Sequence, residues 1–484
     1  MRKLLLFKAF LLSTVFCVSA LDGLHYSTEA QPSFSSGENT PFWLVSNHYG
    51  LSSVKKNNGY FRAGVFRSID ADSASHWGWG AGVDLAAAYN YSSSFIIQQL
   101  YGEVRYRKFA LSIGSKEREP FMLDRRLSSG DLLFSTNARP IPEVRLETPD
   151  YIVIPGLGGW LGLKGYISYG MFTDDRWQRD WAAPGSKRSE DVLFHSKGGF
   201  ARVGNLDKFP VQLEVGFEMA AQFGGRSIAG ERIIRMPSSL KDFMRVFIPS
   251  GGDSSTPAGE QSNIYGNHLG QWSARLEWHA PGGWRPAVYY EHYFEDHSMM
   301  FLDFAWKDCL VGLELGLPEN PFVSKVVYEY LGTKDQSGPV YWDHTPEIPE
   351  QVSGRDNYYN HGIYTGWQHW GMGIGNPLII SPIYNANHII NFRANRLIGH
   401  HIGLEGQPLP CLGYRGLFSY SRTWGTYGSP LPEVQRNINA MLELTLRLER
   451  FKGWSLSGAV AADMGGLLGR SWGGMVTLRK TGIL

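Results

Sequence analysis

A short stretch of the chain places aromatic rings among carboxylate and guanidinium groups. Trp177 and Trp181 lie four residues apart, in a segment that also contains Asp174 and Arg176. Sugars present apolar C–H faces and many hydroxyl groups, so carbohydrate sites combine aromatic rings with polar donors and acceptors. We therefore predict that this segment contacts a polysaccharide. The two tryptophans would be stacking platforms, and Asp174 and Arg176 would be polar contacts.

A second segment has the same combination of side chains. Asn357, Tyr358 and Tyr359 follow one another in the longest region that lacks strand periodicity. We predict that the two tyrosines stack on sugar rings and that Asn357 forms hydrogen bonds with sugar hydroxyls. The alternative for any one ring is a structural role, either in packing the loop itself or in bordering a membrane.

The same side chains admit other chemistry, which the spacing does not favour. Asp174 and Asp175 would supply paired carboxylates for glycoside hydrolysis, but we interpret adjacent loop aspartates as solvated or ion-binding groups. No serine falls in a nucleophile motif, and Cys309 and Cys411 have no metal or redox spacing, so whether they form a disulfide stays open. We predict no catalytic residue, no metal and no cofactor. The histidines after residue 340 lack the i, i+2 spacing that strand ligands need: His344, His361, His369, His388, His400 and His401.

The elements that must position these residues are strands. In residues 438–449 every even-numbered residue is apolar and most odd-numbered residues are polar or charged. Side chains of a strand alternate between its two faces, and a tilted strand crosses a bilayer in about 9–11 residues. We predict that Glu443, Arg447 and Glu449 face a polar interior. The opposite face would meet lipid through Leu442, Leu444, Leu446 and Leu448.

Weaker repeats of this period recur along the chain, in about 17 segments. Because single-chain bacterial barrels have even strand numbers, we expect about 18 strands, with one further strand between Phe42 and Leu51. A soluble β-sandwich or propeller would alternate similarly, but would not carry charges of both signs on so many inward faces. No stretch after the N-terminus approaches the roughly 18 apolar residues of a membrane helix. We predict an all-β fold, a transmembrane antiparallel outer-membrane β-barrel that forms a single domain over residues 21–484.

The N-terminus has the features of a secretory signal peptide. Arg2 and Lys3 precede the mostly apolar residues 4–18, and a small-residue cleavage sequence ends at Ala20. We predict removal of residues 1–20, which takes away three of the 46 basic residues and none of the 45 acidic ones, so that the mature chain is near −2. A chain without basic excess is not expected to bind nucleic acid.

Short and long connections alternate along the predicted barrel. Outer-membrane barrels have short turns on the periplasmic side and long loops on the extracellular side. We expect short periplasmic turns near 107–108, 205–208, 281–283, 317–321 and 451–453. The expected extracellular loops are 116–142, 173–191, 222–268, 333–387 and 422–437. One of them holds a predicted helix, residues 239–248, with Ser239 as N-cap and Leu240, Phe243, Met244 and Phe247 on one face. This helix either covers the barrel mouth or lies on the surface.

Several blocks, in order along nearly the whole mature chain, resemble the Wzi-type capsule assembly proteins. They are residues 40–44, 133–143, 165–170, 218–224, 266–270 and 356–362. The resemblance implies an outer-membrane β-barrel that acts as a lectin and holds capsular polysaccharide on the cell surface. It also implies outer-membrane lipid and other capsule-export components as partners. Little sequence precedes the first strand, so the helical portion of other members is not expected. No binding residue can be carried over position by position.

We therefore predict a non-catalytic barrel in the Gram-negative outer membrane that binds and retains capsular or other surface polysaccharide. The first alternative is a diffusion porin, because charged inward faces also suit a water-filled lumen. The second is an outer-membrane enzyme that modifies lipid or glycan, which would require a serine or carboxylate centre that the sequence does not nominate.

Overall fold

The computed structural model describes residues 23–72, 75–262, 264–295, 300, 306–340, 342–343, 352–447 and 450–484. The predicted signal peptide, His344, Leu448 and Glu449 lie outside these residues. Within them, eighteen strands form a closed antiparallel barrel, as the alternating pattern predicts. In chain order the barrel strands are β1 (Leu24–Gly37), β2 (Asn58–Arg67), β3 (Trp77–Tyr89), β4 (Phe95–Tyr106), β5 (Phe109–Ser115), β6 (Glu143–Glu147), β8 (Leu161–Met171), β10 (Leu193–Val203), β11 (Val211–Phe223), β14 (Asn267–Trp278), β15 (Arg285–Glu295), β16 (Cys309–Gly316), β17 (Lys325–Gly332), β22 (Leu397–Leu409), β23 (Leu412–Gly425), β24 (Pro430–Arg447), β25 (Trp454–Gly465) and β26 (Gly469–Ile483).

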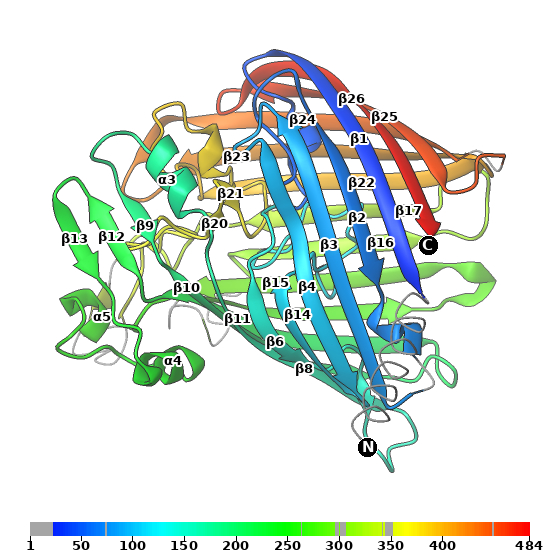
Figure 1. Cartoon of the computed structure of the whole chain (residues 1–484), viewed down its shortest axis with the longest axis horizontal. Coiled ribbons are helices and arrows are strands. Elements are labelled where there is room, and N and C mark those ends of the chain that lie inside the picture. The colour runs from blue at the N-terminus through cyan, green and yellow to red at the C-terminus, as the bar shows by residue number, and fades with distance from the viewer. Residues whose placement is uncertain are drawn as a thin grey trace, which may run out of the picture.

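The first and last strands close the barrel. β1 pairs with β2 on one side and with β26 on the other, where Ala30 faces Leu478 in register, and Figure 1 shows the blue and red strands side by side. Closure leaves no unpaired strand edge, which a membrane-spanning sheet requires because lipid cannot hydrogen-bond to the backbone. No helix among the described residues is long and apolar enough to cross a membrane.

Strand β24 shows how the alternating pattern builds the wall. Leu442 and Leu444 expose their side chains on the outside of the barrel. Glu443 points inward, where its carboxylate pairs with the Arg415 guanidinium at 3.0 Å. An apolar outer face and a polar inner face are what a lipid-facing strand of a barrel requires.

Two expectations about the strands are wrong. The further strand does not lie between Phe42 and Leu51, since residues Phe42–Val45 form the short buried helix α2 and the next strand, β2, begins at Asn58. The segment 422–437 is not a long loop, because β23 and β24 stay paired up to Gly425 and Pro430. Residues 42–51 begin with four apolar residues in a row, a pattern that a strand and a buried helical turn share, and glycines and prolines interrupt the alternation in 422–437.

The connections at one end of the barrel carry further helices and short strands, whereas the other end has mostly short turns. Because long loops of such barrels are extracellular, the end with the long connections faces the outside of the cell. These elements are α3 (Asp175–Trp181), β9 (Arg188–Glu190), β12 (Arg226–Ala229), β13 (Arg232–Arg235), α4 (Leu240–Phe247), α5 (Ala258–Ser262), β18 (Trp342–Asp343), β19 (Val352–Ser353), β20 (Gln368–His369), β21 (Met372–Gly373) and the 3-10 turn Pro382–Tyr384. At the inner end lie β7 (Ile152–Val153) and the 3-10 turns Ile69–Asp72 and Pro281–Gly283. Cys309 and Cys411 are free thiols.

The core of the molecule lies inside the barrel, where two long connections fill the outer half of the lumen. We call residues 116–142 the plug loop and residues 354–395 the cap segment. In the plug loop, Leu127, Leu132 and Leu133 are fully buried, and so is Trp367 in the cap segment. The Trp367 indole N–H donates to the Leu133 carbonyl at 2.8 Å, so the two segments form one unit.

Carboxylates of the barrel wall hold the plug loop by its backbone. Glu329 of β17 accepts hydrogen bonds from the Ser129 N–H at 2.8 Å and the Ser128 hydroxyl at 2.6 Å. Glu291 of β15 accepts from the Leu132 N–H at 3.0 Å. Hydrogen bonding offsets the cost of burying a polar group, so acidic side chains that would suit a water-filled lumen here anchor a plug. Below it, a cavity of about 440 Å³ remains in the inner half of the barrel.

Candidate functional site

Asp174 joins helix α3 to the cap segment. One carboxylate oxygen accepts from the Gln178 amide at 3.2 Å, and the other accepts from the Gln368 amide at 3.1 Å and the Trp370 N–H at 3.2 Å. Burial raises the pKa of this carboxyl above its usual range. Its oxygens are therefore used within the protein, and the predicted contact of Asp174 with a ligand is not available in this arrangement.

The tryptophans of α3 belong to a stack. The Trp177 and Trp181 rings lie 5.1 Å apart, and Trp181 stacks on His388 of the cap segment at 4.8 Å. Trp177 is 5% exposed, and a Cβ at Gly371 would lie 2.6 Å from its ring. The ring of Trp177 thus supports the cap segment and presents no open face to a sugar. Arg176 is exposed, with its side chain 3.6 Å from Asp180.

Truncation of Trp177 tests this structural role. Because the ring is buried, we expect Trp177→Ala to lower the free energy of unfolding of the outer segments by about 3–5 kcal/mol, the range for large buried aromatic residues. Arg176→Ala, one position away on an exposed surface, should change it by less than about 0.5 kcal/mol. Urea denaturation in detergent, followed by tryptophan fluorescence, measures both. Equal stability of the two variants would contradict the buried role.

The tyrosine pair is also part of the core. Tyr358 and Tyr359 have no exposed surface, and both rings contact Tyr293 of β15 at 4.9 and 5.4 Å. The Tyr359 hydroxyl donates to the Leu132 carbonyl of the plug loop. The neighbouring Asn357 is exposed, and its side-chain oxygen accepts from the Asn395 amide at 2.7 Å. Of this predicted trio, only Asn357 is accessible from outside.

Asn357 lines a groove at the outer end of the barrel, with a volume of about 780 Å³. This lies within the roughly 300–1,000 Å³ typical of ligand sites. The walls come from the cap segment, the loop after α3, and the outer tips of the β23–β24 and β25–β26 hairpins. The lining is rich in amides and hydroxyls, with a few aliphatic side chains: Asn357, Asn360, Asn387, Asn391, Gln435, Thr426, Ser429, Ile389, Ile390 and Leu431. We call this the outer groove.

The charge of the outer groove has one sign. Lys187 and Arg393 line it, and none of its described lining residues is an aspartate or glutamate. Arg393 is exposed, and no carboxylate among the described residues pairs with it. The Lys187 ammonium donates to the carbonyls of His361 and Gly362. Burial lowers the pKa of Lys187 to about 8 and that of His361 to about 3, so at neutral pH the lysine is charged and the histidine is neutral.

Helix α3 shapes one wall of this groove without entering it. His388, which stacks on Trp181, lies between the lining residues Asn387 and Ile389. Its ring nitrogen Nδ1 also lies 3.0 Å from the Trp181 carbonyl oxygen. The predicted aromatic residues are therefore connected to the groove, as its support. Sequence reasoning missed Lys187, Arg393, Asn387 and Asn391, although the density of asparagines over residues 385–395 was a readable signal.

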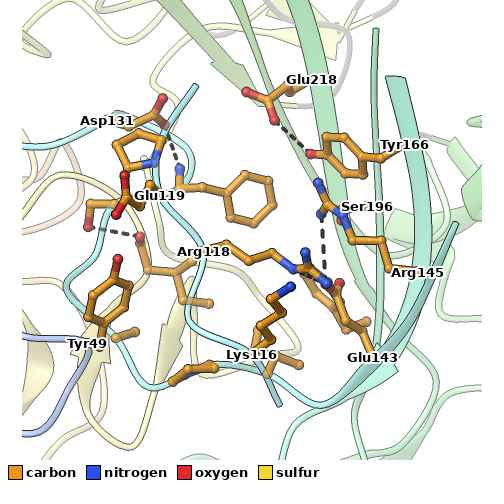
Figure 2. Close-up of a pocket in the computed structure, with 18 of the residues that line it drawn as sticks. Tyr49, Lys116, Arg118, Glu119, Asp131, Glu143, Arg145, Tyr166, Ser196 and Glu218 are labelled. Atoms are coloured by element: carbon orange, nitrogen blue, oxygen red, sulfur yellow. Dashed lines mark hydrogen bonds and ion pairs between the residues drawn. The ribbon is translucent and has the colours of Figure 1, made fainter. Parts of the chain in front are cut away.

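A smaller cavity lies inside the barrel, between the plug loop and strands β6, β8 and β11 (Figure 2). Its volume is about 120 Å³, below that of ordinary ligand sites. Figure 2 shows Arg118 reaching Glu143 and Tyr166 reaching Glu218. These polar groups pair with one another, so the cavity is a packing gap beside the plug.

The histidines do not gather at a metal centre. Across the part of the chain that the structure describes, no group of three or more His, Cys, Asp or Glu side chains is arranged to hold a metal ion. His369 and His401 instead hydrogen-bond to backbone carbonyls of the plug loop, Arg139 at 2.9 Å and Leu127 at 2.8 Å. They join the plug loop to its surroundings.

The outer groove and the plugged lumen can be compared with known proteins. Residues 24–378 of the 484 match the family described as capsule assembly protein Wzi. The chain belongs to the Wzi family. This confirms the resemblance that the sequence blocks indicated. The protein is therefore an outer-membrane protein, as predicted.

Solved structures agree on the fold. The chain is similar to Wzi of Escherichia coli, a carbohydrate-binding barrel involved in group 1 capsule assembly, with a TM-score of 0.58 and 13% identity over 96% of this chain and 85% of that one. It is also similar to OccAB2 of Acinetobacter baumannii, with a TM-score of 0.50 and 8% identity over 96% and 98% of the two chains. At these identities the likeness shows the fold alone. No curated protein matches the chain in sequence.

Proposed function

We propose that this Wzi-family barrel binds surface polysaccharide in the outer groove and retains it at the cell surface without catalysis. The observation that carries the proposal is an amide- and hydroxyl-lined groove of about 780 Å³ at the outer mouth of a barrel whose lumen is plugged. The Escherichia coli relative is described as carbohydrate-binding, which supports the same conclusion. The predicted contact with other capsule-export components stays a prediction from the resemblance.

The lining suits a sugar polymer. Asparagine and glutamine side chains both donate and accept hydrogen bonds. They can therefore pair with a sugar hydroxyl group whether it acts as donor or as acceptor. The apolar C–H faces of sugar rings can rest on aliphatic surface such as Ile389, which is 38% exposed. Each repeat would gain only a few weak contacts. A long polymer rebinds through its other repeats, so retention gains from multivalency.

The groove favours acidic sugar units. Lys187 and Arg393 are the charged groups of its described lining, since His361 is neutral. No carboxylate of that lining neutralises the two cations. Hydrogen bonds between ionised partners are roughly twice as strong as those between neutral ones. A uronic acid carboxylate would therefore bind more strongly here than a neutral hexose would.

The porin alternative conflicts with the packing of the lumen. A diffusion channel needs a continuous wet path, but Leu127, Leu132, Leu133 and Trp367 are buried in the outer half of this barrel. The enzyme alternative gains no support either. The buried carboxylates of the lumen bind backbone N–H groups of the plug loop and lie away from the outer groove.

The direct test is binding of the purified, detergent-folded barrel to the surface polysaccharide of its own cell, with OccAB2 as a barrel control. We expect saturable binding that decreases when the polysaccharide carboxylates are reduced to alcohols. Absence of binding in a sample that shows the mobility shift of a folded barrel on gels would overturn the proposal.

The affinity should depend on pH through Lys187. Burial lowers the pKa of this lysine to about 8, so its positive charge is present below pH 8 and is lost as the pH rises above it. We expect binding of an acidic polysaccharide to weaken between pH 7 and pH 9, and binding of its carboxyl-reduced form to stay constant. Lys187→Arg should flatten the profile, because arginine stays charged over this range. A wild-type profile without a decrease would remove Lys187 from the site.

A further inference from the structure

Helix α4 lies near the outer ends of β10 and β11 (Figure 1), and its aromatic rings contact side chains of the barrel wall. Exposed Ile167 on β8 and Val203 on β10 mark the outward faces of these strands. Tyr169 and His195 have the same parity and therefore also point outward. Phe243 and Phe247 of α4 lie over them, with ring centroids 5.2 Å from Tyr169 and 6.0 Å from His195. The Tyr169 hydroxyl also donates to the Phe243 carbonyl at 3.0 Å.

The height of α4 on the wall follows from Lys197. This residue also points outward from β10, and its ammonium donates to the Phe247 carbonyl at the end of α4. Lys197 lies six residues before Val203, the inner end of β10. With the exposed Val203 taken as the inner edge of the apolar band, roughly 2.5 Å of height per residue of a tilted strand places Lys197 about 15 Å up a band about 25 Å tall. The helix therefore lies against the outer part of the lipid-facing band, where it covers a charge that would be costly in lipid.

Next to the two phenylalanines, α4 carries an apolar stripe that no described part of the protein covers. Leu240, Met244 and Ile248 follow at intervals of four residues and are 82%, 52% and 63% exposed. Residues four apart in a helix share a face. The polar side of the helix is used internally, since Arg245 pairs with Asp242 at 3.0 Å and with Asp253 at 2.6 Å.

We propose that α4 is an interfacial helix that inserts Leu240, Met244 and Ile248 among the acyl chains of outer-leaflet lipid. The stripe is continuous with an established lipid surface, because Ile167, which is exposed on the barrel, pairs in register with the Lys197 that α4 covers. Lys241 borders the stripe with its side chain 68% exposed, and its ammonium pairs with the Asp253 carboxylate at 2.9 Å, so a charged pair flanks the apolar residues at the level of the headgroups. A helix with one apolar and one charged face lies in the plane of the interface.

The insertion would connect the bilayer surface to the outer groove. The long connection that contains α4 also carries Glu260, whose carboxylate lies 3.8 Å from the His361 ring. His361 lines the groove, and its carbonyl accepts from Lys187. A helix fixed in the interface would hold this side of the groove at a set height above the membrane.

The experiment uses the full barrel in nanodiscs of lipopolysaccharide and phosphatidylethanolamine, with one barrel per disc. A diazirine reagent dissolved in the bilayer and a water-soluble diazirine reagent are photoactivated in parallel, and labelled residues are mapped by mass spectrometry. We expect residues 240–248 to be labelled by the bilayer reagent, as Ile167 is, and to be protected from the water-soluble one. The variant L240S/M244S/I248S should lose the bilayer label, whereas V434S, at an exposed site on the outer part of β24, should not.

Labelling of residues 240–248 in the wild type by the water-soluble reagent alone would overturn the proposal, whether or not the triple variant folds. Protection from both reagents in discs that hold two barrels, lost in discs that hold one, would identify a second copy of the chain as the occupant and would also overturn it. Polysaccharide binding is measured on the same samples, so failure of the lipid contact is distinguishable from failure of the groove.

Discussion

The double substitution K187Q/R393Q is expected to remove most of the affinity of the outer groove for an acidic polysaccharide. Each side chain offers a charged hydrogen-bond donor that no carboxylate of the described lining neutralises. A hydrogen bond to a charged group contributes about 1.5–3 kcal/mol, so loss of each cation should weaken binding at least roughly tenfold. If the two contacts are independent, the double variant should lose roughly a hundredfold.

The control for this experiment is a variant with the same loss of charge outside the groove. Lys55 and Lys56 are exposed on the outer connection between β1 and β2 and do not line the groove, so K55Q/K56Q should bind as the wild type does. Titration of the wild type and both double variants by isothermal calorimetry, with acidic and with carboxyl-reduced polysaccharide, gives six affinities to compare. If both double variants weaken binding equally, the effect comes from net charge and the groove is not the site.

The alternating pattern predicts the barrel well because lipid imposes an apolar outer face on every membrane-crossing stretch. The prediction fails where that constraint is absent. The outer part of the β23–β24 hairpin has no continuous apolar face, because glycines and prolines interrupt it, so the segment 422–437 resembles a loop. The strand expected between Phe42 and Leu51 is wrong for a different reason. The run Phe42–Val45 is apolar at both parities, and such a short run does not distinguish a strand from the buried helical turn that it forms.

The site residues show a different limit. A density of aromatic and amide side chains does not distinguish a ring that stacks on a ligand from one that packs a long loop. Tyr358 and Tyr359 are buried because the cap segment needs a core of its own, and Trp177 supports it from the side. The outer groove joins Lys187 to residues near 360, 390, 430 and 467. Five segments so far apart in the sequence come together only through closure of the barrel.

Excision of the plug loop is expected to convert a closed barrel into a conducting one. The plug loop fills the outer lumen, and the cap segment depends on it, since Tyr359 and Trp367 both donate hydrogen bonds to its carbonyls. Gly114 and Glu143 are register partners on β5 and β6, so a short Gly-Ser turn can replace residues 116–142 without straining the wall. In planar bilayers the wild type should show almost no ion current, and the excised variant should show discrete porin-like steps.

The strand network itself does not depend on the plug loop, because neighbouring barrel strands pair backbone to backbone around the whole circumference. The excised variant should therefore keep the gel mobility of a folded barrel, which serves as the control. A wild-type barrel that conducts as a porin does would contradict the sealed lumen and would favour diffusion as the function. An excised barrel that is folded but still closed would show that the cap segment seals the lumen alone. In that case the wall carboxylates Glu291 and Glu329 would only hold the plug loop in place, without closing the barrel.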